Sequence, residues 1–183
     1  YPGKNLGGMG DGGAVVTNNK NLYENIRLLR DVGQAKKYYH ESFGFNSRLD
    51  TIQATGLLIK LKKLNKWNEN RIKIAKLYNK YLLNTGDVVV PGILGKPYKE
   101  NFHIYFIQTE KRDELKEYLD KNGVHCGIHY PVPLHLQNAL KNLGYKKGDF
   151  PITENFAGRI LSLPMYPQLK PTDVLKICNL IKK

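Results

Sequence analysis

Lys4 lies among glycines, a proline and apolar residues, apart from any run of charges. It occurs in the sequence YPGKNLGG, residues 1–8, and a glycine-rich turn and an apolar run, residues 14–17, follow it. A lysine that is partly desolvated loses its proton more readily, and the free amine can form a Schiff base with a carbonyl group. The residue types around Lys4 therefore indicate a role in covalent chemistry.

A second group of polar side chains lies on residues 127–135, GIHYPVPLH. His129, Tyr130 and His135 stand here on a backbone that two prolines stiffen, and such a rigid polar rim suits hydrogen bonding to a substrate. The same residues would also fit an ordered surface loop without a binding role. Both interpretations stay open on these residues alone.

Three other patterns near these groups do not support the chemistry that they suggest. Residues 8–13 match G-x-G-x-x-G, but a strand is expected after them, whereas a dinucleotide site needs a helix there. The histidines around Cys126 lack a further ligand at the usual zinc spacing, so we expect no metal site. On an extended strand Cys126 and His129 point to opposite faces, which argues against a nucleophilic pair.

The elements that must position Lys4 are expected in the first 61 residues. Residues 14–17 read as a short buried strand, and Asn18 or Asn19 can cap a helix that Gly33 closes. Residues 34–46 read as a polar, aromatic loop. A capping box over residues 47–50 predicts the start of a second helix, which no strong breaker separates from a third. Such a long helix could connect two domains.

The remaining residues, 62–183, are expected to form a small α/β domain. Strands are predicted at residues 88–90, 102–108 and 124–128, where apolar, aromatic and β-branched residues gather. Helices are predicted at residues 111–122, 135–142 and 151–161 and from about Pro171 to near the end of the sequence, where apolar residues recur at helical spacing.

Composition limits the class of protein but does not decide its partner. Hydrophobic residues make up 41% of the 183 residues, which suffices for a core, and no apolar run is long enough to span a bilayer. Two cysteines far apart in the sequence fit a reducing, cytoplasmic location. The net charge of +13 fits a lysine-rich solvated surface, an anionic small substrate or a nucleic acid, and charge does not separate these interpretations.

The segment around Lys4 resembles the Schiff-base segment of the DegT/DnrJ/EryC1/StrS family of pyridoxal-phosphate-dependent sugar aminotransferases. In that family the segment usually reads Ser-Phe-aromatic-Pro-x-Lys-Asn-Leu-Gly. Further stretches that look like family landmarks follow in family order and cover nearly the whole chain. They are KYYH (37–40), GFNSRLD (44–50) with Gln53 and Ala54, GIHYPVPLH (127–135) and LSLPMYP (161–167).

The resemblance implies a cofactor, pyridoxal 5'-phosphate, and roles for residues of the first domain. Lys4 would hold the cofactor as a Schiff base and then act as the general acid and base of transamination. Asn46 would reach the cofactor phosphate of a neighbouring subunit, and Arg48 would support either that phosphate or the helix start. Tyr39, in the KYYH landmark, would contact the substrate.

The resemblance also implies an overall fold, a reaction and a site in the second domain. The fold would be the C-terminal part of a fold-type I (aspartate aminotransferase-like) enzyme, α/β in class: residues 1–61 end the large domain, and residues 62–183 form the small domain. The reaction would move an amino group from an amino acid, glutamate in our interpretation, to a nucleotide-linked ketosugar. His129, Tyr130 and His135 would lie near the sugar, in a homodimer with shared active sites that binds neither nucleic acid nor membrane.

Other functions stay open on the sequence alone. The family resemblance leads us to expect about as many residues upstream as are present, and these would supply most of the cofactor pocket. The chain could instead be a relic without activity, or a basic module that binds nucleic acid, although no clustered basic face or nucleic-acid motif is visible. Residues 31–33 (DVG) replace the frequent Asn-His-Gly, and Thr55 replaces the usual alanine; neither touches the expected chemistry.

Overall fold

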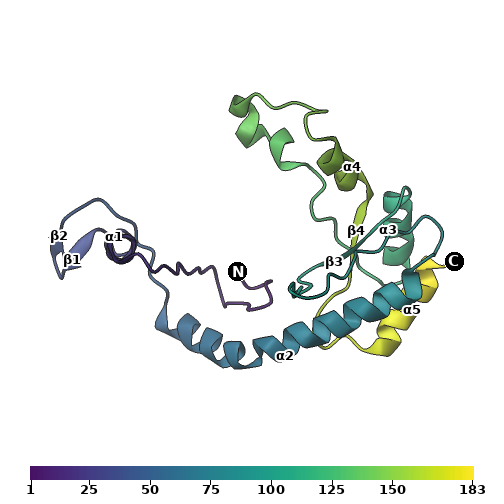
Figure 1. The fold of residues 1–183 in the computed structure, drawn as a ribbon, viewed down its shortest axis with the longest axis horizontal. Coiled ribbons are helices and arrows are strands. Elements are labelled where there is room, and N and C mark those ends of the chain that lie inside the picture. The colour runs from purple at the N-terminus through teal and green to yellow at the C-terminus, as the bar shows by residue number, and fades with distance from the viewer. The chain divides into compact units, whose positions relative to one another are not determined.

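The structure, a computed structural model, describes all 183 residues. The backbone forms two compact units, residues 1–65 and 66–183. The long helix α2 (Thr51–Leu82) runs from the first unit into the second (Figure 1). The sequence also placed a domain boundary inside this helix, between residues 61 and 62.

Helix α1 (Lys20–Arg30) forms as the sequence predicted. The Asn19 side chain caps it, because its Oδ1 atom accepts a hydrogen bond from the Leu22 N–H at 3.1 Å. At the other end, the Gly33 N–H donates to the Leu28 carbonyl at 2.8 Å, with a φ of +71° at Gly33. Glycine adopts this left-handed conformation at little cost, so it ends the helix.

The segment after α1 folds back onto that helix. Strands β1 (Gln34–Lys36) and β2 (Tyr39–His40) pair antiparallel where the sequence predicted only a loop. The Phe45 N–H then donates to the Leu29 carbonyl at 2.6 Å. These backbone bonds fix the residues that precede α2 against the end of α1.

Helix α2 is a single helix of 32 residues, which confirms the expected near-continuity. It begins at Thr51, so the prediction that a capping box starts the helix at residue 47 is wrong. The Ser47 N–H donates to the Arg30 carbonyl at 2.9 Å instead. That bond ties residue 47 to α1 and delays the helix.

The prediction of a buried strand at residues 14–17 is also wrong for this chain. These residues are exposed and have no strand partner. A strand is stable only when its backbone groups pair with a neighbour. No other segment of residues 1–183 supplies that neighbour.

The second unit contains one two-stranded sheet and several helices. Strands β3 (Tyr105–Gln108) and β4 (Ile160–Leu163) pair antiparallel, with Tyr105 opposite Leu163. The expected strands at 88–90 and 124–128 are reduced to isolated bridges, one between Val89 and Gln108 and one between Gly127 and Ser162. The helices are α3 (Arg112–Lys121), α4 (Pro151–Arg159), α5 (Pro171–Ile181) and the 3-10 helices Leu134–Leu136 and Asn138–Leu143.

The core of this unit lies between the sheet, α3, α5 and the last turns of α2 (Figure 1). Tyr78 of α2 stacks on Tyr105 of β3 with ring centroids 4.7 Å apart. Burial raises the pKa of both tyrosines, so their hydroxyl groups stay protonated. The largest fully buried side chains are Tyr78, Leu82, Tyr105, Ile107, Leu119, Leu161, Val174 and Cys178.

None of the helices combines the length and the apolar character that crossing a membrane requires.

Candidate active site

Lys4 stands on a tight turn at the start of the first unit. Its backbone N–H donates to the Tyr1 carbonyl at 3.2 Å, and the residue is exposed. The sequence predicted a partly desolvated lysine. Residues 1–183 leave Lys4 exposed instead.

The segment that follows Lys4 is anchored on α2 by two side chains. Gln53 accepts from the Gly10 N–H through Oε1 at 2.7 Å and donates to the Asp11 carbonyl through Nε2 at 2.9 Å. The Lys60 ammonium donates to the Gly7 carbonyl at 2.6 Å. The first turns of α2 therefore hold the lysine segment in place.

This anchoring was not predicted. Gln53 was named only as part of a family landmark, and Lys60 contributed only to the net charge of the chain. The hydrogen bond from Lys60 to the Gly7 carbonyl joins two segments that are far apart in the sequence. The spacing of apolar residues along a helix does not predict such a contact. The run of glycines was the one feature of the sequence that could have indicated a close contact here. In the structure, a Cβ on Gly8 would lie only 2.8 Å from Gln53 Oε1, so a residue without a side chain is needed.

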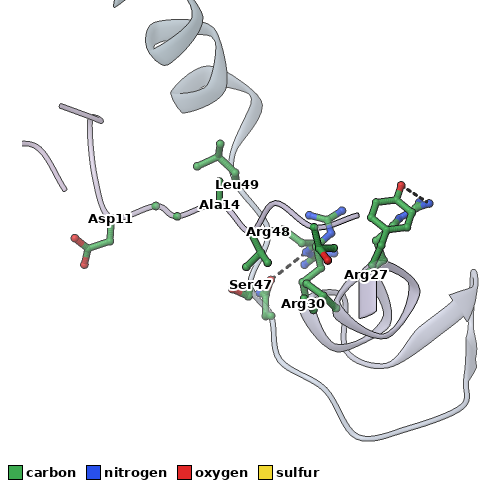
Figure 2. Close-up of a pocket in the computed structure, with 14 residues that line it drawn as sticks. Asp11, Ala14, Arg27, Arg30, Ser47, Arg48 and Leu49 are labelled. Carbon is green, nitrogen blue, oxygen red and sulfur yellow. Dashed lines mark hydrogen bonds between the residues drawn. The ribbon is translucent and has the colours of Figure 1, made fainter. Parts of the chain in front are cut away.

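A pocket of about 880 Å³ lies between the glycine-rich segment, α1 and the residues before α2. Figure 2 shows that Arg27 and Arg30 reach it from α1, whereas Arg48 comes from the segment that leads into α2. Asn46 and Ser47 also line it. Lys4 and Tyr39 do not, so the structure brings Asn46 and Arg48 together but leaves these two outside.

The side chain of Arg48 is oriented by two contacts. Its Nε–H donates to Asn46 Oδ1 at 3.0 Å, and its Nη1 lies 3.3 Å from Asp31 Oδ1. Arg27 donates to the Tyr23 hydroxyl at 3.4 Å. The pocket thus carries three guanidinium groups, of which one has a carboxylate partner.

Tyr39 lies on β2, on the exposed surface of the first unit. The Lys36 ammonium stands 5.7 Å from the centre of its ring. Tyr38 and Phe43 of the same segment are exposed as well, and Phe43 is 99% exposed. These exposed aromatic residues precede Asn46 in the sequence.

In the second unit, His129 and Tyr130 present their rings side by side. The ring centroids are 5.4 Å apart in an edge-on arrangement, and both residues are exposed. The Nδ1 atom of His129 lies 2.9 Å from the hydroxyl of Ser162 on β4. Lys4 belongs to the other unit.

His135 is placed differently from its two neighbours. Its side chain is only 8% exposed, and its Nε2 lies 3.0 Å from Glu154 Oε1 on α4. Burial acts to raise the pKa of Glu154, but hydrogen bonds from the Gly148 N–H, His135 and the Phe150 N–H outweigh it and lower that pKa. The pair therefore fastens η1 (Leu134–Leu136) to α4 and leaves His135 little surface for a ligand.

Cys126 is half-buried in the second unit. Burial raises the pKa of its thiol to about 12, so the thiol is protonated at neutral pH. No group of three or more His, Cys, Asp and Glu side chains is arranged to hold a metal ion.

The residues of the first unit suit a phosphorylated carbonyl cofactor by their donor chemistry. Guanidinium and amide groups that line one pocket are the donors that phosphate oxygens accept from. A lysine amine is the group that forms a Schiff base with a carbonyl carbon, and Lys4 is exposed. The first unit therefore contains the residue types that a phosphorylated aldehyde would require.

The chain belongs to the DegT/DnrJ/EryC1/StrS aminotransferase family, whose sequence model matches residues 1–182. The erythromycin biosynthesis sensory transduction protein EryC1 of Saccharopolyspora erythraea is 45% identical over 170 residues, which cover 92% of this chain and 46% of that protein. The dTDP-3-amino-3,4,6-trideoxy-alpha-D-glucose transaminase of Streptomyces venezuelae is 40% identical over 183 residues, which cover all of this chain and 48% of that protein.

Solved structures agree with the sequence comparison. The crystal structure of S. venezuelae DesV in complex with a ketimine intermediate superposes with a TM-score of 0.94 at 41% identity, and the match covers all of this chain and 49% of DesV. A family aminotransferase from Brucella abortus superposes with a TM-score of 0.91 at 42% identity, and the match covers all of this chain and 48% of that protein. These findings confirm the predicted family, fold class and pyridoxal phosphate cofactor.

The chain spans about half the length of the curated relatives that it matches.

Proposed function

We propose that this chain is part of an aminotransferase that moves an amino group from an amino acid, glutamate in our assignment, to a nucleotide-linked ketosugar. The observation that carries the proposal is an exposed Lys4 that directly precedes a glycine-rich segment, which Lys60 and Gln53 anchor on α2. Relatives whose names state transamination of dTDP- and UDP-linked sugars support the substrate class. Both cysteines are free, which suits a cytoplasmic enzyme.

Lys4 is the residue that we assign to the chemistry. Pyridoxal phosphate, when bound, supplies an electron sink that makes the C–H bond beside the amino group acidic. Lys4 would hold the cofactor through its amine. Its Nζ would accept the proton that leaves the reacting carbon of the donor and carry it away from that carbon, which is general acid and base catalysis by a positioned amine.

The other assigned residues bind rather than react. Asn46 and Arg48 donate to the cofactor phosphate, and Arg27 and Arg30 add positive charge to the same pocket. His129 and Tyr130 contact the sugar from the second unit, as does Tyr39 from the first. We assign His135 a positioning role, because its imidazole is engaged by Glu154.

A homodimer with shared active sites is the assembly that we propose. Lys4 does not line the pocket of Asn46 and Arg48. In the proposed dimer, each active site would therefore combine Lys4 of one subunit with the Asn46 and Arg48 pocket of the other. The exposed aromatic surface of Tyr38, Tyr39 and Phe43 supports a protein partner beside Asn46, because such side chains are seldom left in water together.

Lys4 is tested by mass spectrometry on the full-length protein, incubated with pyridoxal phosphate and reduced with borohydride. We expect one reduced adduct, on Lys4, and loss of both adduct and turnover in Lys4→Ala. Lys20→Ala is the matched control, because Lys20 is an exposed lysine that only pairs with Glu24. Transamination that survives Lys4→Ala would overturn the assignment.

Shared sites are tested by mixing two inactive variants. Lys4→Ala and Asn46→Ala dimers, exchanged at random, would form hybrids with one intact site, and recovered activity would approach about a quarter of wild type. No recovery in a mixture that demonstrably exchanges subunits would exclude a site built from both chains.

A further inference from the structure

The hydroxyl of Ser162 is held in a fixed position beside His129. Ser162 lies on β4, opposite Phe106 of β3, and is 6% exposed. On its other side the Ser162 N–H donates to the Gly127 carbonyl at 2.8 Å, and the Gly127 N–H donates to the Ser162 carbonyl at 3.0 Å. Pairing on both sides fixes the backbone from which this side chain projects.

The imidazole of His129 is held against the same strand segment. A Cβ on Gly127 would lie only 2.6 Å from His129 Cε1, so the ring rests on the backbone of Gly127. Its Nδ1 lies 2.9 Å from Ser162 Oγ. Because this bond occupies Nδ1, the ring nitrogen left for a ligand is Nε2.

The direction of this hydrogen bond follows from the hydroxyl's surroundings. The hydroxyl of Ser162 lies within hydrogen-bond distance of His129 Nδ1, and a buried hydroxyl without an acceptor would be costly. The hydroxyl therefore donates to Nδ1. A neutral imidazole that accepts at Nδ1 carries its proton on Nε2 and donates from there.

We propose that Ser162 is a positioning residue that fixes His129 as an Nε2–H donor to an acceptor oxygen of the nucleotide-sugar. The identity of the ligand rests on the proposed function. The assignment of Nε2–H as the donor rests on the geometry of residues 127–129 and 162. Gly127 completes the arrangement, because a side chain there would displace the ring. His129 touches the ligand, and Ser162 acts through it.

The first test compares Ser162→Ala with Ser162→Thr in the full-length holoenzyme. Ser162→Ala should raise KM for the nucleotide-sugar roughly three- to tenfold, with kcat and KM for the amino donor nearly unchanged. Ser162→Thr keeps the hydroxyl on a strand position that tolerates β-branching, so KM should return toward wild type. In a His129→Ala background, Ser162→Ala should add no further change.

The second test reads the tautomer directly. Nitrogen-15 NMR of the imidazole should show the Nε2–H form of His129 in wild type and a mixture of tautomers in Ser162→Ala. Unchanged KM, or an unchanged tautomer in a folded Ser162→Ala protein, would overturn the proposal. If wild type shows no transamination, the proposed function fails, whereas the tautomer still decides whether Ser162 sets the proton on His129.

Discussion

Gln53 joins the lysine segment to α2 by accepting from the Gly10 N–H at 2.7 Å and donating to the Asp11 carbonyl at 2.9 Å. Both bonds come from one amide, so a single substitution tests them. Gln53→Leu should lower the free energy of unfolding by about 2 kcal/mol, because two backbone groups lose their partners. Hydrogen exchange over residues 7–13 should quicken at the same time, and cofactor attachment to Lys4 should slow.

Thr55→Ala is the matched control on the same helix. The Thr55 hydroxyl donates only to the Thr51 carbonyl one turn earlier, so its loss should change stability by less than about 0.5 kcal/mol. If Gln53→Leu and Thr55→Ala have equal effects on exchange over residues 7–13, Gln53 does not anchor the lysine segment.

The parts of the fold that depend on local sequence were predictable. Asn19 was one of two expected caps, and the structure uses it; the continuity of α2 followed from the absence of a breaker. The helix at residues 151–161 was predicted too long, since β4 begins at Ile160. The strand that pairs with β4 is β3, which lies far away in the sequence, and no local pattern predicts that pairing.

The site was predictable in its residue types but not in its contacts. Lys4 stood out because of its neighbours, whereas the pairing of His135 with Glu154 depends on how the segment between them folds. Arg27 and Arg30 look like ordinary helix-surface charges in the sequence. Only the return of residues 46–48 to α1 makes them part of a pocket.

Gly33→Ala should destabilise the segment that carries Asn46. Gly33 has a φ of +71°, and a Cβ there would lie 1.7 Å from the Ser42 carbonyl oxygen. The left-handed conformation alone costs about 1–2 kcal/mol for alanine, and the overlap adds to it. Thermal unfolding should show the loss, and phosphate binding should weaken because Asn46 lies at the end of this segment.

Gly92→Ala controls for the loss of glycine itself. No heavy atom lies within 4 Å of a Cβ at that position, so its stability should stay within about 0.5 kcal/mol of wild type or rise slightly. Equal stability of the two variants would contradict the close approach at Gly33.

Asp87 should make the stability of the second unit depend on pH in the acid range. The Glu110 N–H donates to Asp87 Oδ2 at 2.6 Å and the Thr109 hydroxyl at 2.8 Å, and both bonds lower the pKa of Asp87 below its ordinary 3.8. A carboxyl group with a lowered pKa in the folded state contributes its full stabilisation at pH values above its ordinary pKa. This stabilisation is lost as the pH falls through the pKa of the folded state. Asp87→Asn should therefore cost stability at pH 7 and progressively less below pH 4. A difference between the two proteins that stays constant from pH 7 to pH 2 would refute this.

Arg71 should be the most costly side chain to remove from the second unit. It is buried, its pKa is lowered by that burial, and its Nη1 donates to the carbonyls of Phe102, His103 and Met165 at 3.0 to 3.3 Å. Arg71→Met fills similar space but leaves these carbonyls without their donor, so we expect a loss of roughly 3 kcal/mol in the free energy of unfolding. Lys73→Met, an exposed change on the same helix, should stay within about 0.5 kcal/mol of wild type. Chemical denaturation measures both, and a loss at Arg71 no larger than that at Lys73 would show that the three carbonyls do not depend on it.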